Sequence, residues 1–286
     1  MSNNLLDLSG KIDHAMVEVF EAVATVTAAK GIRYFVVGAT ARDMILSYGY
    51  GIESRRATVD VDLGVEVADW AEFHTLKNGL IATGQFKPSK SMHRLVYNDS
   101  LPIDIVPFGP LENMNKEISW PPDHSIRMNV MGFEDAYRGA QWVRLRSEPA
   151  LDIPFATPAG LAIMKVIAWN DRSPHGSKDA GDLAFLMRTY LDAGNQGRLA
   201  NELPDLLDEA DFDYEGASAR LLGRDMAKIL SPATKSVILD ILDRETKEQS
   251  QYRLVGDMMK AYAVSGDAFE NYLLLLQALK GGIQEG

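Results

Sequence analysis

The strongest structural signal in the chain is the segment at residues 58–67, TVDVDLGVEV. Its apolar and polar residues alternate, as they do in a β-strand with one buried face. Successive side chains on a strand point to opposite sides, so Asp60 and Asp62, at positions i and i+2, share one face. The pattern therefore predicts a strand that presents two carboxylates together.

A second strand signal precedes this one, at residues 34–37 (YFVV), and it ends at Gly38-Ala39-Thr40. Residues 41–48 have the pattern of a short helix, so Gly38 is expected at a strand-to-helix turn. Glycine permits close backbone approach at such a turn, and the amides that open a helix can donate to phosphate oxygens. We therefore expect Gly38 and the Thr40 hydroxyl to lie beside a phosphate.

A third carboxylate follows on a predicted hairpin, whose strands at residues 94–97 and 103–106 are joined by the turn residues 98–100. Asp104 interrupts an apolar run, where an ionised group needs a partner or a metal if it is buried. Carboxylate oxygens are the ligands that Mg²⁺ prefers, and a third one completes a two-metal clamp. A solvated strand face is the alternative for Asp60 and Asp62 alone, but the three signals in this order favour a site for Mg²⁺ or Mn²⁺.

Strand signals end near residue 146, and helical patterns dominate the rest of the chain. We expect further strands near residues 128–133 and 142–146. Helices are expected at residues 13–30, 70–81, 158–169, 178–190, 199–209, 217–229, 234–242 and 252–279. The predicted fold class is α+β, with a mixed-sheet head at residues 1–150 followed by a helical domain at residues 151–286.

Composition limits the kinds of metal site and of binding partner that the chain can have. The 286 residues include no cysteine, and the five histidines show no ligand spacing, so any metal must be bound through oxygen. The 29 basic and 40 acidic residues give a net charge of −11, which argues against a broad basic surface that coats nucleic acid. The apolar runs fall short of the roughly 18 residues that a membrane span needs, and the first residues do not resemble a signal peptide. We expect a cytoplasmic protein with no membrane partner.

Two pairs of segments resemble known nucleotidyltransferases. Residues 37–43 (VGATARD) and 56–63 (RATVDVDL) resemble the motif of the DNA polymerase β superfamily, in which a Gly-Gly or Gly-Ser turn precedes an Asp-x-Asp. Residues 161–172 (LAIMKVIAWNDR) and 178–183 (KDAGDL) are similar to the AbiEii/AbiGii branch, which includes toxins of type IV toxin–antitoxin and phage-defence systems. Ala39 departs from the motif, because the family usually has a second Gly or a Ser there.

The resemblance implies a role for each matched residue. It implies metal binding by Asp60, Asp62 and Asp104, phosphate contact at Gly38 and Thr40, catalytic roles for Lys165 and Asp179, and nucleotide binding by Asp182. From the residues alone, the Lys165 side chain must leave an apolar helix for a polar cleft or for solvent. Asp179 and Asp182 alone would fit a helix cap and a first-turn acid.

Basic residues of the head offer further contacts. Arg55, Arg56, His93 and Arg94 are candidates for binding the triphosphate or the acceptor, although a basic pair on a surface is usually solvated.

These features predict a metal-dependent nucleotidyltransferase that transfers a nucleoside monophosphate from an NTP to an acceptor. We expect tRNA or another macromolecule, such as a protein, as the acceptor, and an antitoxin as a partner if the protein is a toxin. The alternatives are a tRNA-end-processing or poly(A)-polymerase-like enzyme and a small-molecule (antibiotic) nucleotidyltransferase. A binding protein that keeps the fold without catalysis is the alternative from another class, and retention of all three carboxylates argues against it.

Overall fold

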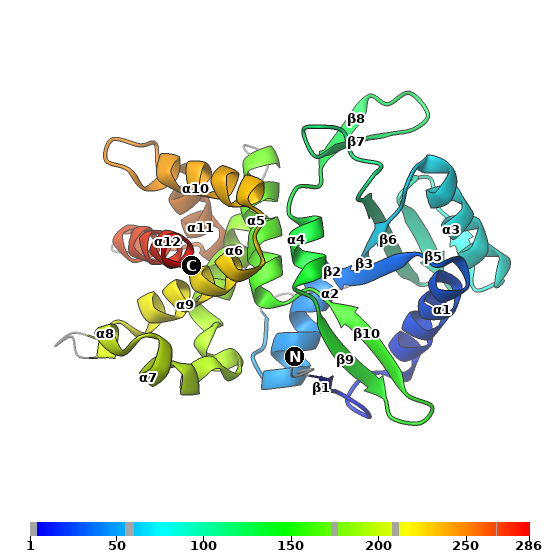
Figure 1. Cartoon of the computed structure of the whole chain (residues 1–286), viewed down its shortest axis with the longest axis horizontal. Helices are drawn as coiled ribbons and strands as arrows, with labels where there is room; N and C mark the ends of the chain where they lie inside the picture. Colours follow the sequence, from blue (N-terminus) through cyan, green and yellow to red (C-terminus); the bar gives the residue numbers. More distant parts are fainter. Residues whose placement is uncertain (1–4, 55–59, 173–176, 208–211, 267) are drawn as a thin grey trace. The chain divides into compact units, whose positions relative to one another are not determined.

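The computed structural model describes residues 5–54, 60–172, 177–207, 212–266 and 268–286. The chain divides into two compact units, Met1–Thr157 and Pro158–Gly286 (Figure 1). The first contains the sheets, and the second is helical in its described part, which confirms an α+β fold with a mixed-sheet head.

The first unit is built on an eight-stranded mixed sheet. In spatial order its strands are β1 (Leu6–Asp7), β9 (Gln141–Arg146), β10 (Leu151–Phe155), β2 (Arg33–Val37), β3 (Val61–Glu66), β6 (Leu101–Phe108), β5 (Arg94–Tyr97) and β4 (Phe86–Pro88). The β3–β6 pair is parallel, whereas β3 is antiparallel to β2 and β6 is antiparallel to β5. A separate antiparallel pair is formed by β7 (Glu117–Trp120) and β8 (Ile126–Asn129).

Helix boundaries in this unit follow ordinary capping chemistry. Helix α1 (His14–Lys30) begins after Asp13, whose side chain accepts a hydrogen bond from the backbone N–H of Ala15. It ends at Gly31, whose φ of 66° suits a residue without a Cβ. The other helices of the unit are α2 (Gly38–Asp43), which continues as a π-helical segment at Met44–Gly49, α3 (Trp70–Ala82) and α4 (Phe133–Arg138).

Helix α4 covers one end of a sheet face, and the carboxylates lie farther along that face. Phe35 of β2 packs edge-on against Phe133 and Tyr137 of α4. Phe108 of β6 packs edge-on against Phe35 and lies tilted against the same two rings of α4. A Cβ at Gly64 of β3 would lie 2.4 Å from the Phe35 ring, so this strand position accepts only glycine without repacking. Since side chains alternate along a strand, Asp62 points to the same side as Gly64.

The second unit contains helices α5 (Pro158–Arg172), α6 (Lys178–Thr189), α7 (Leu199–Glu202), α8 (Pro204–Leu207), α9 (Tyr214–Ile229), α10 (Pro232–Thr246), α11 (Arg253–Tyr262) and α12 (Ala268–Glu285). Helices α9 and α12 pack backbone against backbone. A Cβ at Gly223 of α9 would lie 2.2 Å from the carbonyl oxygen of Leu279, and one at Gly282 of α12 would lie 2.0 Å from that of Arg220. Larger side chains at Gly223 or Gly282 would force this helix pair apart.

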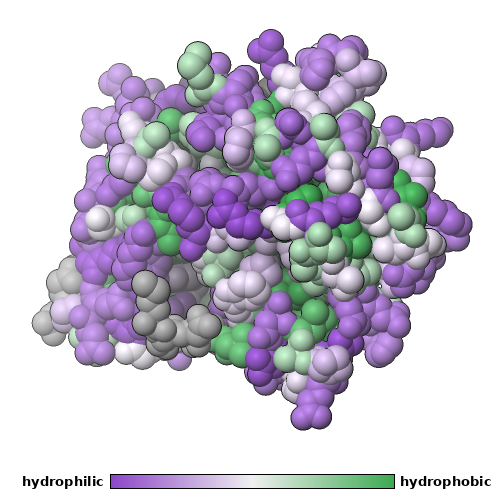
Figure 2. All heavy atoms as spheres, turned by 45° about the vertical axis from the view of Figure 1, so that its right-hand side comes forward, coloured by the Kyte–Doolittle hydropathy of each residue, from purple (hydrophilic) through white to green (hydrophobic). Residues whose placement is uncertain are grey.

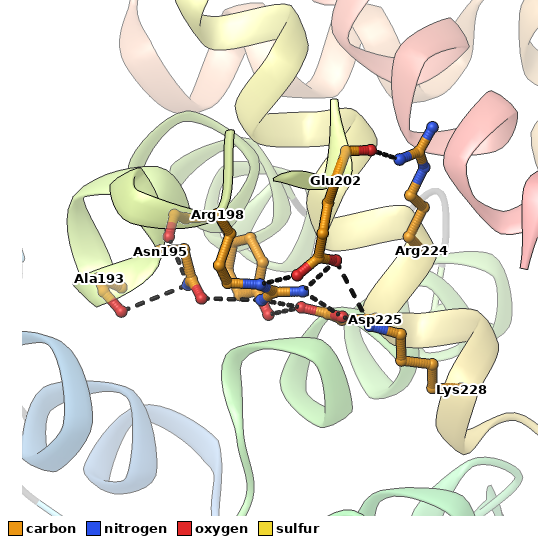
Figure 3. A network of polar contacts seen from close by, with 8 residues as sticks. Ala193, Asn195, Arg198, Glu202, Arg224, Asp225 and Lys228 are labelled. Carbon is orange, nitrogen blue, oxygen red and sulfur yellow. Dashed lines mark hydrogen bonds and ion pairs between the residues drawn. The ribbon is translucent and has the colours of Figure 1, made fainter. Parts of the chain in front are cut away.

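A half-buried ionic network ties the α7 segment to α9 (Figure 3). The Arg198 guanidinium donates to both carboxylate oxygens of Glu202 at 2.6 and 2.8 Å and to both oxygens of Asp225 at 2.6 and 2.9 Å. The Tyr190 hydroxyl and the Lys228 amine also donate to Asp225. Arg198 and Lys228 supply two positive charges, and the Tyr190 hydroxyl supplies a further hydrogen bond. The negative charges of Glu202 and Asp225 are therefore well compensated.

Three expected elements differ from the structure. The helix expected at residues 252–279 is two helices, α11 and α12, separated where Ala263 and Gly266 adopt positive φ. The helix expected at residues 199–209 is divided before Pro204, which cannot donate a backbone hydrogen bond. The strand expected at residues 128–133 ends at Asn129, and Phe133 instead begins α4.

The molecular surface is mainly polar in the view of Figure 2, where hydrophobic side chains form small separate patches. Among the residues that the structure describes, no helix is both long enough and apolar enough to cross a bilayer.

Candidate active site

The adjacent strands β3 and β6 bring three carboxylates together. Asp62 of β3 lies directly opposite Asp104 of β6 in the parallel register, and Asp60 lies two residues before Asp62. One oxygen of each carboxylate lies within 4.8 Å of the others, and all three residues are half-buried. Within the described ranges, no other set of three His, Asp or Glu side chains meets this spacing. The cluster expected from the i, i+2 pattern and the hairpin is therefore present.

The turn after β2 lies against this cluster. Gly38 has a φ of +65°, and a Cβ at this position would lie 2.1 Å from Oδ2 of Asp62. The backbone at Gly38 thus occupies the space that any other residue's side chain would fill. Val37, the residue before α2, provides no side-chain cap, so the first amides of this helix have no side-chain acceptor from the N-cap.

Thr40 holds the segment that carries Asp60. Its side chain is buried, and its hydroxyl donates to the backbone carbonyl of Asp60 at 2.7 Å. Arg42, also buried, donates from Nε to Asp43 at 2.8 Å and from a terminal nitrogen to Ser54 Oγ at 3.1 Å. Helix α2 therefore fixes the chain on both sides of residues 55–59. The phosphate contact expected of Thr40 stays a prediction, and Arg56 lies outside the described residues.

Arg94 of β5 pairs with the third carboxylate. The antiparallel register places Arg94 opposite Asp104, and the guanidinium donates from Nε to Oδ1 at 2.6 Å and from a terminal nitrogen to Oδ2 at 2.7 Å. The same terminal nitrogen lies 3.5 Å from Oδ2 of Asp60. Hydrogen bonding to Asp104, joined by the negative charges of the three aspartates, raises the pKa of Arg94. His93 Nε2 lies 4.0 Å from Oδ1 of Asp104, and its ring packs against Trp120.

The helical unit contains a second group of predicted site residues. The Lys165 amine of α5 lies 2.9 Å from Oδ1 of Asp179 and 2.6 Å from Oδ2 of Asp182, both on α6. The three side chains are largely buried, and Arg172 Nε reaches Asp179 at 3.8 Å. Burial alone would lower the pKa of Lys165, but the charges of Asp179 and Asp182 outweigh it and raise the pKa, so the amine is charged. The catalytic roles expected of Lys165 and Asp179 stay predictions.

A model of the family described as "AbiEii: Nucleotidyl transferase AbiEii toxin, Type IV TA system" matches residues 22–270 of the chain. No curated protein sequence is similar enough to count as a match.

The chain also has some similarity to solved structures, three of which follow. ANT(2'')-Ia in complex with adenylyl-2''-tobramycin is 10% identical with a TM-score of 0.38, over 64% of this chain and 98% of that chain. A CCA-adding enzyme with ATP is 15% identical with a TM-score of 0.32, over 92% of this chain and 66% of that chain. A tRNA-processing enzyme in its apo form I is 11% identical with a TM-score of 0.25, over 92% of this chain and 78% of that chain.

Proposed function

Because the chain belongs to the AbiEii nucleotidyltransferase toxin family, we propose that it transfers a nucleoside monophosphate from an NTP to a macromolecular acceptor with the help of a divalent cation. The family identifies the protein as a nucleotidyltransferase. The metal, the acceptor and the residue roles are the parts that we propose. The observation that carries them is the meeting of Asp60, Asp62 and Asp104 within 4.8 Å.

The donor set of this cluster fits Mg²⁺ or Mn²⁺. It offers oxygen atoms alone. Because the three aspartates are half-buried, water can fill the coordination positions that the carboxylates leave open. A divalent cation held by Asp60, Asp62 and Asp104 would neutralise charge on the triphosphate and favour deprotonation of the acceptor hydroxyl. The chain's own contribution is to keep these carboxylates on one face of two hydrogen-bonded strands.

The turn at Gly38 would receive the triphosphate. Its close approach to Asp62 and the uncapped amides that open α2 support phosphate binding beside the carboxylates. Thr40 donates its hydroxyl proton to the Asp60 carbonyl, so a phosphate contact would require this hydroxyl to turn its proton from the carbonyl to the phosphate. We propose a further nucleotide contact for Arg56, which belongs to the basic pair that precedes Asp60 in the sequence.

Lys165, Asp179 and Asp182 complete the proposal. Lys165 is charged and Asp179 is its ion-pair partner, so the two side chains hold each other in place. We propose that these two residues act in transfer and that Asp182 contributes to nucleotide binding while stabilising the helical unit. The family description supports a toxin role with an antitoxin as partner, and tRNA is the acceptor that we favour.

The decisive experiment is incorporation of label from each NTP separately, with and without Mg²⁺, into tRNA, protein or small acceptors including aminoglycosides. We expect Mg²⁺-dependent labelling of tRNA from one preferred NTP by the full chain. D62N is expected to abolish it, whereas the control D99N, at an exposed carboxylate of the same unit, retains it. Labelling of a small molecule alone would replace the proposed acceptor, and labelling by D62N at the normal rate would contradict the proposed site.

A further inference from the structure

Arg94 is built into the carboxylate cluster by the strand register. Because β5 and β6 are antiparallel with Arg94 opposite Asp104, the two side chains meet without depending on any loop. The guanidinium engages both oxygens of Asp104, at 2.6 and 2.7 Å, in the planar fork that arginine forms with carboxylates. It therefore uses part of the acceptor capacity of both oxygens that Asp104 would offer to a metal ion.

The charges of the cluster also indicate that Arg94 and a bound cation would compete for the carboxylates. Three aspartates carry three negative charges, and one guanidinium offsets one of them. Arg94 also reaches toward Asp60, with 3.5 Å between its terminal nitrogen and Oδ2, so it spans two of the three carboxylates. A divalent cation bound at the cluster must share these oxygens with Arg94 or displace it.

We infer that Arg94 is a positioning residue that keeps Asp104 oriented toward Asp60 and Asp62 and competes with the divalent cation for the carboxylates. This inference rests on the proposed metal site. Before the cation binds, Arg94 limits the repulsion among the three carboxylates. When the cation binds, the guanidinium gives up part of its contact, and this cost lowers the affinity of the site.

A second arginine–aspartate pair in the same unit provides a matched control. Arg144 of β9 lies opposite Asp152 of β10, and it donates from Nε and from a terminal nitrogen at 2.7 and 2.8 Å. Both pairs join antiparallel neighbours, and their arginines are similarly exposed, with 35% of the Arg94 side chain and 31% of the Arg144 side chain accessible, although Asp152 is more exposed than Asp104. Loss of a cross-strand fork should therefore affect folding similarly in R94Q and R144Q, and only R94Q should affect the metal.

The test is Mn²⁺ binding to the full chain, measured by electron paramagnetic resonance of the free ion and by calorimetry. We expect R94Q to bind Mn²⁺ at least about tenfold more tightly than the wild type, because a competing positive charge is gone. R144Q should bind like the wild type. An unchanged or weaker affinity in R94Q would overturn the inference.

Three further variants separate the possible failures. R94K keeps the charge but not the fork, so its Mn²⁺ affinity should stay within about threefold of the wild type while its turnover falls. Affinity as high as in R94Q would mean that charge does not govern binding and would also overturn the inference. D62N should lose Mn²⁺ binding. If D62N binds Mn²⁺ normally, the metal site itself has failed, independently of Arg94. If R94Q does not fold by circular dichroism, R94M, which keeps the apolar stem, provides the same comparison.

Discussion

The backbone of Gly38 and the carboxylate of Asp62 occupy adjoining space, because a Cβ at position 38 would lie 2.1 Å from Oδ2 and 2.8 Å from Cγ of Asp62. We therefore predict that Gly38→Ala displaces Asp62. Alanine at position 38 would have to keep a φ of +65°, and its methyl group would push the Asp62 side chain out of the cluster. Nucleotide transfer should fall by about 100-fold, measured as kcat/KM for the labelled NTP.

Gly31→Ala is the matched control for this change. Gly31 has a φ of +66° but no atom within 4 Å of a built Cβ, so alanine there introduces backbone strain alone. It should cost about 1 kcal/mol of unfolding free energy and leave transfer unchanged. Wild-type transfer by Gly38→Ala would show that this close approach is not needed.

Replacing Asp60 or Asp62 with Asn should separate activity from stability. Each variant keeps the shape of the side chain but loses a charge that binds the cation, so transfer should fall by orders of magnitude. Without a divalent cation the melting temperature should hold or rise, because like charges within 4.8 Å repel. Mg²⁺ should raise the melting temperature of the wild type and not that of the variants. An activity loss that merely follows unfolding would mean that the pair is structural.

The carboxylate cluster could be predicted because strand alternation is a local property. Asp60 and Asp62 share a face whatever the rest of the chain does. Pairing of Asp104 with Arg94 is a matter of hairpin register, since Tyr97 opposite Leu101 places Arg94 opposite Asp104. The sequence shows both strands, but several registers are compatible with such a short loop. For this reason Arg94 was expected to bind triphosphate or acceptor, and its contact with the third carboxylate was missed.

Helix breaks and irregular strands were harder to predict. Ala263, which separates α11 from α12, adopts a φ of 52° although alanine is the best helix former. Ala263 is exposed, and its backbone N–H donates to the last carbonyls of α11, so only Gly266 marks the break in the sequence. Strand β10 contains Pro154, which cannot donate to a sheet and therefore argues against a strand. Its pairing with β9 and β2 becomes visible only when the sheet is assembled.

Lys165 offers a test of the buried ion pairs in the helical unit. Lys165→Met would leave Asp179 and Asp182, with 12% and 10% of their side chains exposed, without their shared cation. We expect a loss of about 3–5 kcal/mol of unfolding free energy together with loss of transfer. Asp179→Asn should lower transfer more than stability, and Asp182→Asn should lower stability more than transfer. Urea unfolding and kcat measured on the same samples check this, and the reverse order would exchange the two roles.

The Arg198–Asp225 contact should make stability depend on acidity. Burial by itself would raise the pKa of Asp225, but hydrogen bonds from Arg198, Lys228 and Tyr190 outweigh it and hold the pKa below its ordinary value. A carboxyl with a lowered folded pKa stabilises the protein above its unfolded pKa, and this stabilisation is lost as the pH falls through the folded value.

Asp225→Asn should therefore cost about 3 kcal/mol near pH 7, and its difference from the wild type should shrink as the pH falls below about 4. Urea unfolding across this pH range measures the change. Asp240→Asn, at an exposed position of α10, should differ little from the wild type at any pH. A cost for Asp225→Asn that stays constant down to pH 2 would mean that packing around the side chain, rather than its charge, stabilises α7 against α9.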